Sequence, residues 1–288
     1  MPPESHFADA DGIRLHYLTW RPPDAASGAG TVVLAHATGF LAALWTPIAE
    51  RLAAIGYTIF AYDARGHGDS EKPPPEGNNY AWDRFWQDLR ALLDALDLRD
   101  VLFAGHSAGG AAGLHLASQH PAYVSRIAVF EPIMIPGSVP PDQRRHDEMS
   151  EGARRRRQVF ASTDEAYGQY RTRSLFERWP EEMLRLYAEA GTYVREDGQV
   201  QLKCPPAVEA TIFAHSGDLD TWERLADISA PTLVMLGGQT EGFLKMVAEG
   251  AAERLPQGRL HTFPDLGHLG PMEDPEAVAA ALIDFFAG

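Results

Sequence analysis

One serine is surrounded by three glycines and two alanines in the stretch FAGHSAGG, residues 103–110, at the centre of Gly105-His106-Ser107-Ala108-Gly109. The apolar run before it predicts a buried strand, and the alanine- and leucine-rich run after it predicts a helix. This is the context of the nucleophile elbow, G-x-S-x-G, in which a serine lies on a sharp strand-to-helix turn that leaves no room for larger side chains. The start of the following helix also favours developing negative charge. Ser107 is therefore the candidate nucleophile.

A serine hydroxyl needs a base to remove its proton. His268 is the candidate base, because it follows the last expected strand and precedes a final helix whose start Pro275 marks. Three other histidines fit different roles. His36 and His67 lie in tight turns, where an imidazole usually satisfies backbone groups, and His106 is expected to point away from the nucleophile beside it.

The order of the expected elements supplies the scaffold for these residues. Residues 1–20 predict two strands joined by an Asp11-Gly12 turn. From residue 31 to residue 135, short apolar runs alternate with amphipathic helical patterns, and the alternation returns after residue 216. This alternation is typical of a parallel sheet covered by helices on both faces.

The alternation is suspended over residues 136–215. Helical patterns follow one another there without a strong strand: residues 162–165 form a capping box, and Pro180 suits the first position of another helix. The segment is rich in large aromatic residues, most of which we expect in its core and some around a pocket. The sequence thus divides into a core of residues 1–135 and 216–288 and a helical cap of residues 136–215.

Four stretches of this chain resemble the α/β-hydrolase fold superfamily. They are HATGF, DARGHGDS, GHSAGG and LGHLGPMEDP, and with the element order they cover nearly the whole chain. The resemblance implies a mostly parallel eight-stranded sheet flanked by helices, a helical cap acting as a lid, and an activity of the serine esterase or lactonase type. Serine at position 107 argues against haloalkane dehalogenase and epoxide hydrolase chemistry, for which the resemblance would require aspartate.

Two glutamates compete for the role of the carboxylate that orients the base. In the superfamily this acid most often follows the seventh strand in a G-x-x-D pattern, but three residues past Gly237 this chain has Thr240. Glu241, one residue later, is one alternative. Glu131 is the other, and resembles relatives with a glutamate after the sixth strand. We favour Glu131, because a carboxylate at the end of an apolar strand needs a partner such as an imidazolium.

An oxyanion hole needs two N–H donors near the developing charge. One is expected from Ala108, directly after the nucleophile. By resemblance, the second follows an H-G pair; here Ala37 replaces the glycine, which makes Thr38 the donor. Asp63 and Arg65, in DARGHGDS, are expected to stabilise a turn and not to act in catalysis.

Composition and charge limit which binding partners and which cellular compartment we expect. A net charge of −15 argues against nucleic acid and anionic lipid surfaces. The run Arg154–Arg157 lies in a segment of nearly balanced charge, so we expect a solvated, ion-paired helix face. Cys204 is the only cysteine, and neither a secretory signal nor a membrane span is recognisable, which favours the cytoplasm. With no metal-binding or nucleotide-binding motif, we expect no cofactor.

These observations predict a serine hydrolase that cleaves a carboxylic ester or lactone of a small, largely apolar molecule through an acyl-enzyme. The same residues would also serve C–C bond hydrolysis or perhydrolysis. A different class remains open, namely a ligand-binding receptor or carrier on the same scaffold, because the usual G-x-x-D acid is missing.

Overall fold

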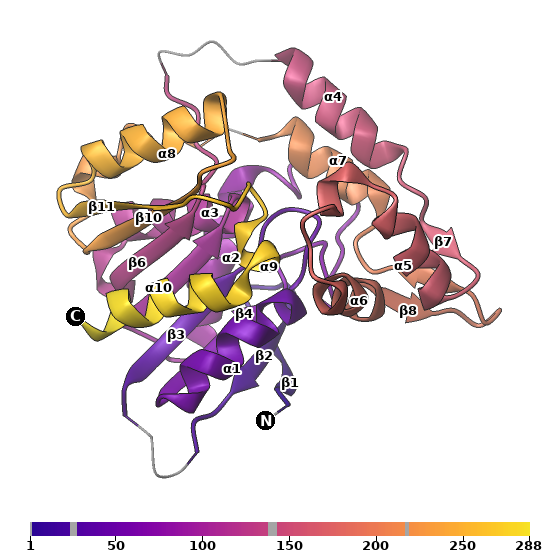
Figure 1. Ribbon diagram of the computed structural model, residues 1–288, viewed down its shortest axis with the longest axis horizontal. Coiled ribbons are helices and arrows are strands. Elements are labelled where there is room, and N and C mark those ends of the chain that lie inside the picture. Colours follow the sequence, from indigo (N-terminus) through magenta and orange to yellow (C-terminus); the bar gives the residue numbers. More distant parts are fainter. Residues whose placement is uncertain (1, 24–27, 138–142, 217–218) are drawn as a thin grey trace.

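An eight-stranded sheet runs through the centre of the computed structural model, which describes residues 2–23, 28–137, 143–216 and 219–288, with residues 143–147 by their backbone alone (Figure 1). In spatial order its strands are β1 (Glu4–Asp9), β2 (Arg14–Trp20), β4 (Tyr57–Tyr62), β3 (Gly30–Ala35), β5 (Val101–His106), β6 (Val124–Phe130), β10 (Thr232–Gly237) and β11 (Gly258–Phe263). β2 pairs antiparallel with both its neighbours, and all other neighbouring pairs are parallel. The expected mostly parallel sheet is confirmed.

The expected turn joins the first two strands. Asp11 and Gly12 both have positive φ, at 58° and 85°, and the Gly12 N–H donates to the side chain of Asp9. Strand pairing then brings Asp9 opposite Arg14. The hairpin predicted from the Asp11-Gly12 pair is therefore confirmed.

Helices cover both faces of the sheet. Successive side chains of a strand point to opposite faces, and here both faces are apolar, so each needs a cover of helices. Val32 and Leu34 belong to the apolar cluster on one face, and Val33 and Ala35 belong to the cluster on the other. The first face packs against α1 (Thr46–Ala54) and α10 (Pro275–Ala287), the second against α2 (Trp82–Ala95), α3 (Ala108–Gln119) and α8 (Phe243–Arg254). No helix in the described ranges is long and apolar enough to cross a membrane.

The segment between β6 and β10 forms a group of helices on one side of the sheet, at the right of Figure 1. These helices are α4 (Gln143–Arg154), α5 (Thr163–Arg171), α6 (Glu181–Ala190) and α7 (Pro206–Ala214). As predicted, the Ser162 hydroxyl caps α5 by accepting the Glu165 N–H at 3.2 Å. Pro180 precedes α6 as its cap and is not its first residue, one position from the prediction.

A small antiparallel sheet also lies in this segment, in the order β7 (Val159–Phe160), β9 (Val200–Leu202) and β8 (Thr192–Val194). The sequence indicated no strong strand over residues 136–215, and these three strands have only two or three residues each. Strands of two or three residues are too short to produce a recognisable alternation.

An apolar cluster joins this segment to the core. Phe40 and Leu41, in the loop after β3, pack with Phe176 and Tyr187 of the segment and with Leu269 from the loop after β11. Both of these loops follow the carboxyl ends of parallel strands, the edge of the sheet at which α/β proteins build their sites. The helices α4 to α7 therefore stand next to the elements that carry the candidate residues.

Candidate active site

Ser107 occupies the turn between β5 and α3. Its backbone adopts φ 52° and ψ −116°, a strained conformation for a residue with a side chain. A Cβ on Gly105 would lie 2.7 Å from the Gly110 Cα. One on Gly109 would lie 2.6 Å from the Ala35 carbonyl oxygen. The two motif glycines are thus required because a strand or a helix backbone is packed directly against each of them.

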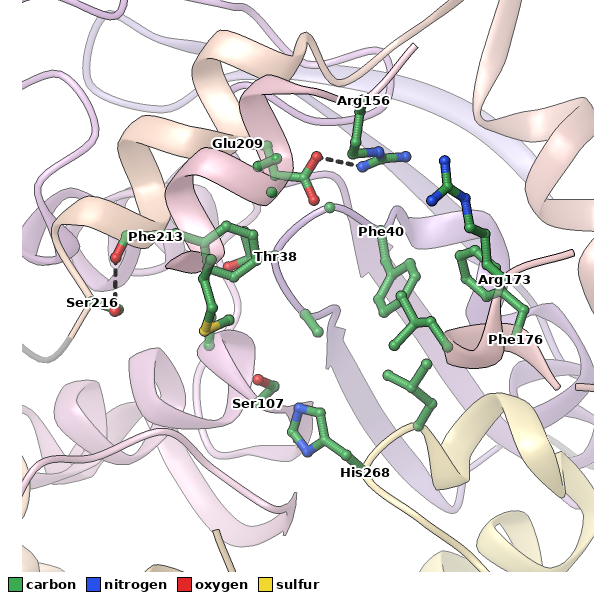
Figure 2. A pocket seen from close by; sticks show the side chains of 18 of the residues that line it. Thr38, Phe40, Ser107, Arg156, Arg173, Phe176, Glu209, Phe213, Ser216 and His268 are labelled. Carbon is green, nitrogen blue, oxygen red and sulfur yellow. Dashed lines mark hydrogen bonds and ion pairs between the residues drawn. The ribbon is translucent and has the colours of Figure 1, made fainter. Parts of the chain in front are cut away.

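His268 lies in the loop between β11 and the short helix α9 (Gly270–Glu273). Its Nδ1 donates a hydrogen bond of 2.7 Å to Glu131 Oε2. Because an ionised carboxylate can only accept, a neutral His268 ring carries its proton on Nδ1 and keeps a lone pair on Nε2. Figure 2 shows the ring of His268 turned toward the Ser107 hydroxyl. The three side chains are arranged in the order that proton transfer from a serine requires.

Glu131 is held firmly in this position. It directly follows β6, its side chain is fully buried, and its backbone φ of 41° turns it out of the strand. Its second oxygen, Oε1, accepts the Gly237 backbone N–H at 2.8 Å. Glu241 is exposed in the loop before α8. Of the two candidate acids, the structure therefore brings Glu131 to His268 and leaves Glu241 at the surface.

His106 contributes to the site in a way that the sequence did not reveal. Its Nε2 donates to the backbone carbonyl of His268 at 2.8 Å. Complete burial, and secondarily the neighbouring His268 ring, hold the pKa of His106 well below its usual value. His106 is therefore an uncharged brace for the backbone of the candidate base.

Both expected oxyanion donors lie at the same cavity as Ser107. Ala108 is the first residue of α3, so its N–H has no partner within the helix. Thr38 lies in the loop after β3, which is fixed by a hydrogen bond of 2.9 Å from the Gly39 N–H to His67 Nε2. Thr38 and Ala108 thus line the cavity beside Ser107 from two separate elements, as an oxyanion hole would require.

The histidines and the arginine of the neighbouring turns satisfy local groups, as predicted. His67 Nδ1 donates to the Arg65 carbonyl at 2.9 Å, and both ring nitrogens of His36 bond to backbone groups. The Arg65 guanidinium forms a buried ion pair with Asp88 at 2.5 Å. These residues build the turn that supports the Thr38 loop.

Asp63 has the same structural role. Its carboxylate accepts hydrogen bonds from His16 Nδ1 at 2.7 Å and from the backbone N–H groups of Ala42 and Asp69. Burial alone would raise the pKa of Asp63, but the bond from His16 and the other donors outweigh it and lower the pKa to about 2. Ligand atoms of His16, Asp63 and Asp69 lie within 4.8 Å of one another, the spacing of a metal-binding cluster. The hydrogen bonds already account for this cluster as a brace between two loops.

The candidate residues open into a cavity of about 800 Å³ (Figure 2). Its floor carries Ser107 and His268, and aromatic side chains from α4 to α7 and their connections form much of the wall. The lining residues include Phe40, Phe160, Tyr170, Phe176, Tyr187 and Phe213. Cavities of this size, mostly apolar with a few polar groups, accommodate small molecules.

The arginine run only partly follows its expected solvated role. Arg155 pairs with Glu151, and Arg157 pairs with Glu165, at exposed positions. Arg156 instead reaches inward and forms an ion pair with the buried Glu209 of α7, and it lines the cavity (Figure 2). Sequence spacing could not single out Arg156 as the arginine of the run that pairs with a buried carboxylate.

Comparison with known proteins agrees with this architecture. The chain is 26% identical to a non-heme chloroperoxidase of Burkholderia pyrrocinia over 90% of each chain. It is also 26% identical to the 2-hydroxy-6-oxononadienedioate/2-hydroxy-6-oxononatrienedioate hydrolase of Paraburkholderia xenovorans, over 97% of this chain and 93% of that one. The crystal structure of E-2-(acetamidomethylene)succinate hydrolase superposes with a TM-score of 0.82 and 20% identity, over 99% of this chain and 100% of that one.

A family match covers most of the chain. Residues 32–281 match the alpha/beta hydrolase family, and this range contains the elbow, the Thr38 loop and the loop of His268. Together with the sheet order and the helices on both faces, the match confirms the fold expected from the sequence. The chain belongs to the alpha/beta hydrolase family.

Proposed function

We propose that this protein is a serine hydrolase that cleaves a carboxylic ester or lactone of a small, largely apolar molecule. The observation that carries the proposal is the hydrogen bond from His268 Nδ1 to Glu131, with Ser107 on the other side of the ring. A hydrophobic cavity directly over Ser107 supports a small organic substrate. We further propose that residues 136–215 act as a cap that encloses this substrate.

The proposed reaction proceeds through an acyl-enzyme. Ser107 Oγ attacks the carbonyl carbon while His268 Nε2 takes its proton, and Glu131 stabilises the resulting imidazolium. The N–H groups of Ala108 and Thr38 donate to the oxygen that becomes negative. His268 then protonates the departing alkoxide, and the acyl-enzyme forms. A water molecule, deprotonated by His268, attacks the acyl carbon and releases the acid and free Ser107.

C–C bond hydrolysis is a second candidate for the same residues. It is favoured by the similarity, over almost the full length of both chains, to the hydrolase of Paraburkholderia xenovorans named above. In that reaction the leaving group would be a carbanion-like carbon in place of an alkoxide, and His268 would protonate it. Ester and lactone hydrolysis is ranked first because an alkoxide leaves more readily than a carbanion-like carbon, which would also need its negative charge stabilised.

A fluorophosphonate probe and a panel of nitrophenyl esters and lactones test the proposal. We expect the probe to label the wild-type protein and to fail on Ser107→Ala, and we expect turnover of at least one ester or lactone to fall by about 10³-fold or more in that variant. Ser216→Ala is the matched control. Ser216 lines the same cavity, but its hydroxyl donates to the Phe213 carbonyl, so labelling and turnover are expected to persist.

Equal labelling of the wild type and Ser107→Ala would contradict the serine mechanism. An unlabelled wild-type protein that still binds small molecules in the cavity would instead support the receptor or carrier alternative.

A further inference from the structure

We propose that the cavity contains a binding site for a substrate carboxylate on the side away from Ser107, and that Arg173 is the residue that binds it. This inference rests on the proposed function, since it describes the second end of the molecule that Ser107 would attack. It assigns the substrate class as esters or lactones that carry a negative charge at a distance from the reacting carbonyl.

The charge of the cavity wall is the first observation. Among the residues that the structure describes, its lining includes four arginines, Arg155, Arg156, Arg157 and Arg173, and one carboxylate, that of Glu209. The chain as a whole carries a net charge of −15, so this wall has the opposite sign from the overall charge. A wall of this kind attracts anions into the cavity.

Three of these four arginines already have a carboxylate partner. Arg156 is paired with Glu209 and also donates to the Tyr187 hydroxyl at 2.9 Å. Arg155 and Arg157 are paired with glutamates that lie outside the cavity lining, Glu151 and Glu165. Glu151 is shared with Arg154, so it neutralises Arg155 only in part. Within the described part of the chain, the fourth arginine has no such partner and contributes its full charge to the wall.

Arg173 is that arginine. Among the described residues, no carboxylate lies within ion-pair distance of its guanidinium, whereas Arg185 and Arg195 of the same segment both have such partners. Its backbone is fixed between α5 and the next turn, because its N–H donates to the Tyr170 carbonyl and its own carbonyl accepts from Phe176. Figure 2 shows the Arg173 side chain extending along the cavity on the side away from Ser107 and His268.

The surroundings favour recognition of a carboxylate by this group. A guanidinium presents a planar set of N–H donors that matches the two oxygens of a carboxylate. Arg173 is exposed and therefore accessible to a ligand, while apolar side chains such as Phe40 and Phe176 line the same cavity between it and Ser107. The substrate that fits this wall has a reactive carbonyl at one end, an apolar middle and a carboxylate at the other end.

Paired esters test the assignment. Mono-(4-nitrophenyl) esters of straight-chain dicarboxylic acids of increasing length are compared with esters in which the free carboxylate is replaced by a neutral carboxamide. At the best length, we expect wild-type kcat/KM to favour the carboxylate ester by about tenfold or more. In Arg173→Gln, kcat/KM for this ester is expected to fall by about 10- to 100-fold, while the value for the carboxamide ester changes less than about twofold.

Arg171→Gln is the matched control. It removes the same charge two residues away, but Arg171 donates to the Tyr167 hydroxyl and does not line this cavity. The preference for the carboxylate ester is expected to survive in this variant and partly in Arg173→Lys. If the wild type shows no preference, or if Arg173→Gln slows both esters equally, or if Arg171→Gln abolishes the preference as well, the site is assigned wrongly.

A binding measurement separates this inference from the proposed function. Calorimetric titration with adipate and its neighbours in length measures the carboxylate site without any turnover. We expect Arg173→Gln to weaken this binding by about tenfold. Loss of binding in Arg173→Gln, in a protein that hydrolyses no ester, would support the carboxylate site and overturn the hydrolase. If ester hydrolysis depends on Ser107 but the wild type and Arg173→Gln bind dicarboxylates equally well, the hydrolase is supported and the carboxylate site is overturned.

Discussion

The Glu131 carboxylate has one hydrogen bond on each oxygen, from His268 Nδ1 and from the Gly237 N–H. The side chain is fully buried, and as a carboxylate it accepts at both oxygens. This geometry keeps the His268 proton on Nδ1 and leaves Nε2 free toward Ser107. Glu131, which fixes the tautomer of the proposed base His268, is thus held by Gly237 of the neighbouring strand β10 as well as by His268 itself.

Glu131→Gln is expected to lower kcat for ester hydrolysis by about 10²- to 10⁴-fold. Glutamine offers one oxygen and one NH₂ group, so it must turn its NH₂ toward either Gly237 or His268. If the NH₂ faces His268, it stabilises the tautomer with the proton on Nε2, which cannot act as a base toward Ser107.

Steady-state kinetics measures the effect. Glu241→Gln is the matched control, and we expect its kcat to change by less than about twofold. The reverse pattern would identify Glu241 as the acid.

At the scale of elements, the loop after β3 is held from two sides. The Gly39 N–H donates to His67 of the core, and its carbonyl accepts from the Tyr187 hydroxyl of α6 at 3.0 Å. Gly39 has a positive φ of 82°, and a Cβ there would lie 2.5 Å from Glu209 Oε1. Since Thr38 precedes Gly39, helices outside the main sheet help to position the proposed oxyanion donor.

Tyr187→Phe is expected to lower kcat by about tenfold with little change in KM, because the buried Gly39 carbonyl loses its donor and the Thr38 N–H is less well directed. The cost in stability is about 1 to 2 kcal/mol. Kinetics and urea unfolding measure the two effects. Tyr170→Phe serves as control, since that ring stacks on Tyr187 and lines the same cavity. An equal loss of kcat in the control would show that the aromatic cluster, and not the Gly39 contact, is responsible.

At the scale of the whole molecule, several histidines are buried as neutral rings. Burial is the main cause that lowers the pKa of His36 and His106 and lowers the pKa of His67 to about 3. The unfolded chain, with histidine pKa values near 6.5, binds protons more readily than the folded protein. The stability that these rings contribute is therefore complete above about pH 6.5 and declines as the pH falls, for His67 down to about pH 3.

Urea unfolding across pH 8 to 4.5 tests this linkage. We expect a plateau above about pH 7 and then a decline of up to about 1.4 kcal/mol per pH unit for each such histidine. The decline is expected to become shallower in His67→Gln and to stay the same in His6→Gln, because His6 is partly exposed. A free energy of unfolding that is constant between pH 8 and pH 5 would contradict the buried neutral state.

The sequence by itself determined the features that depend on neighbours along the chain. The strand and helix alternation, the Asp11-Gly12 turn and the elbow at Ser107 all follow from local patterns of side-chain size and polarity. Local patterns could not reveal β7, β8 and β9, because two or three residues do not establish a period. Local patterns also suggested His268, whereas Glu131 and Glu241 became candidate acids through the resemblance to the α/β-hydrolase superfamily.

Only the tertiary structure decided which distant groups meet. Glu131 reaches His268 because β6, β10 and β11 are adjacent in the sheet, although the two residues are far apart in the sequence. The inward turn of Arg156 and the position of Arg173 on the cavity wall depend in the same way on how α4 to α7 pack. Spacing along a chain specifies local conformation, whereas contacts between elements depend on strand order and packing, which no single stretch of sequence contains.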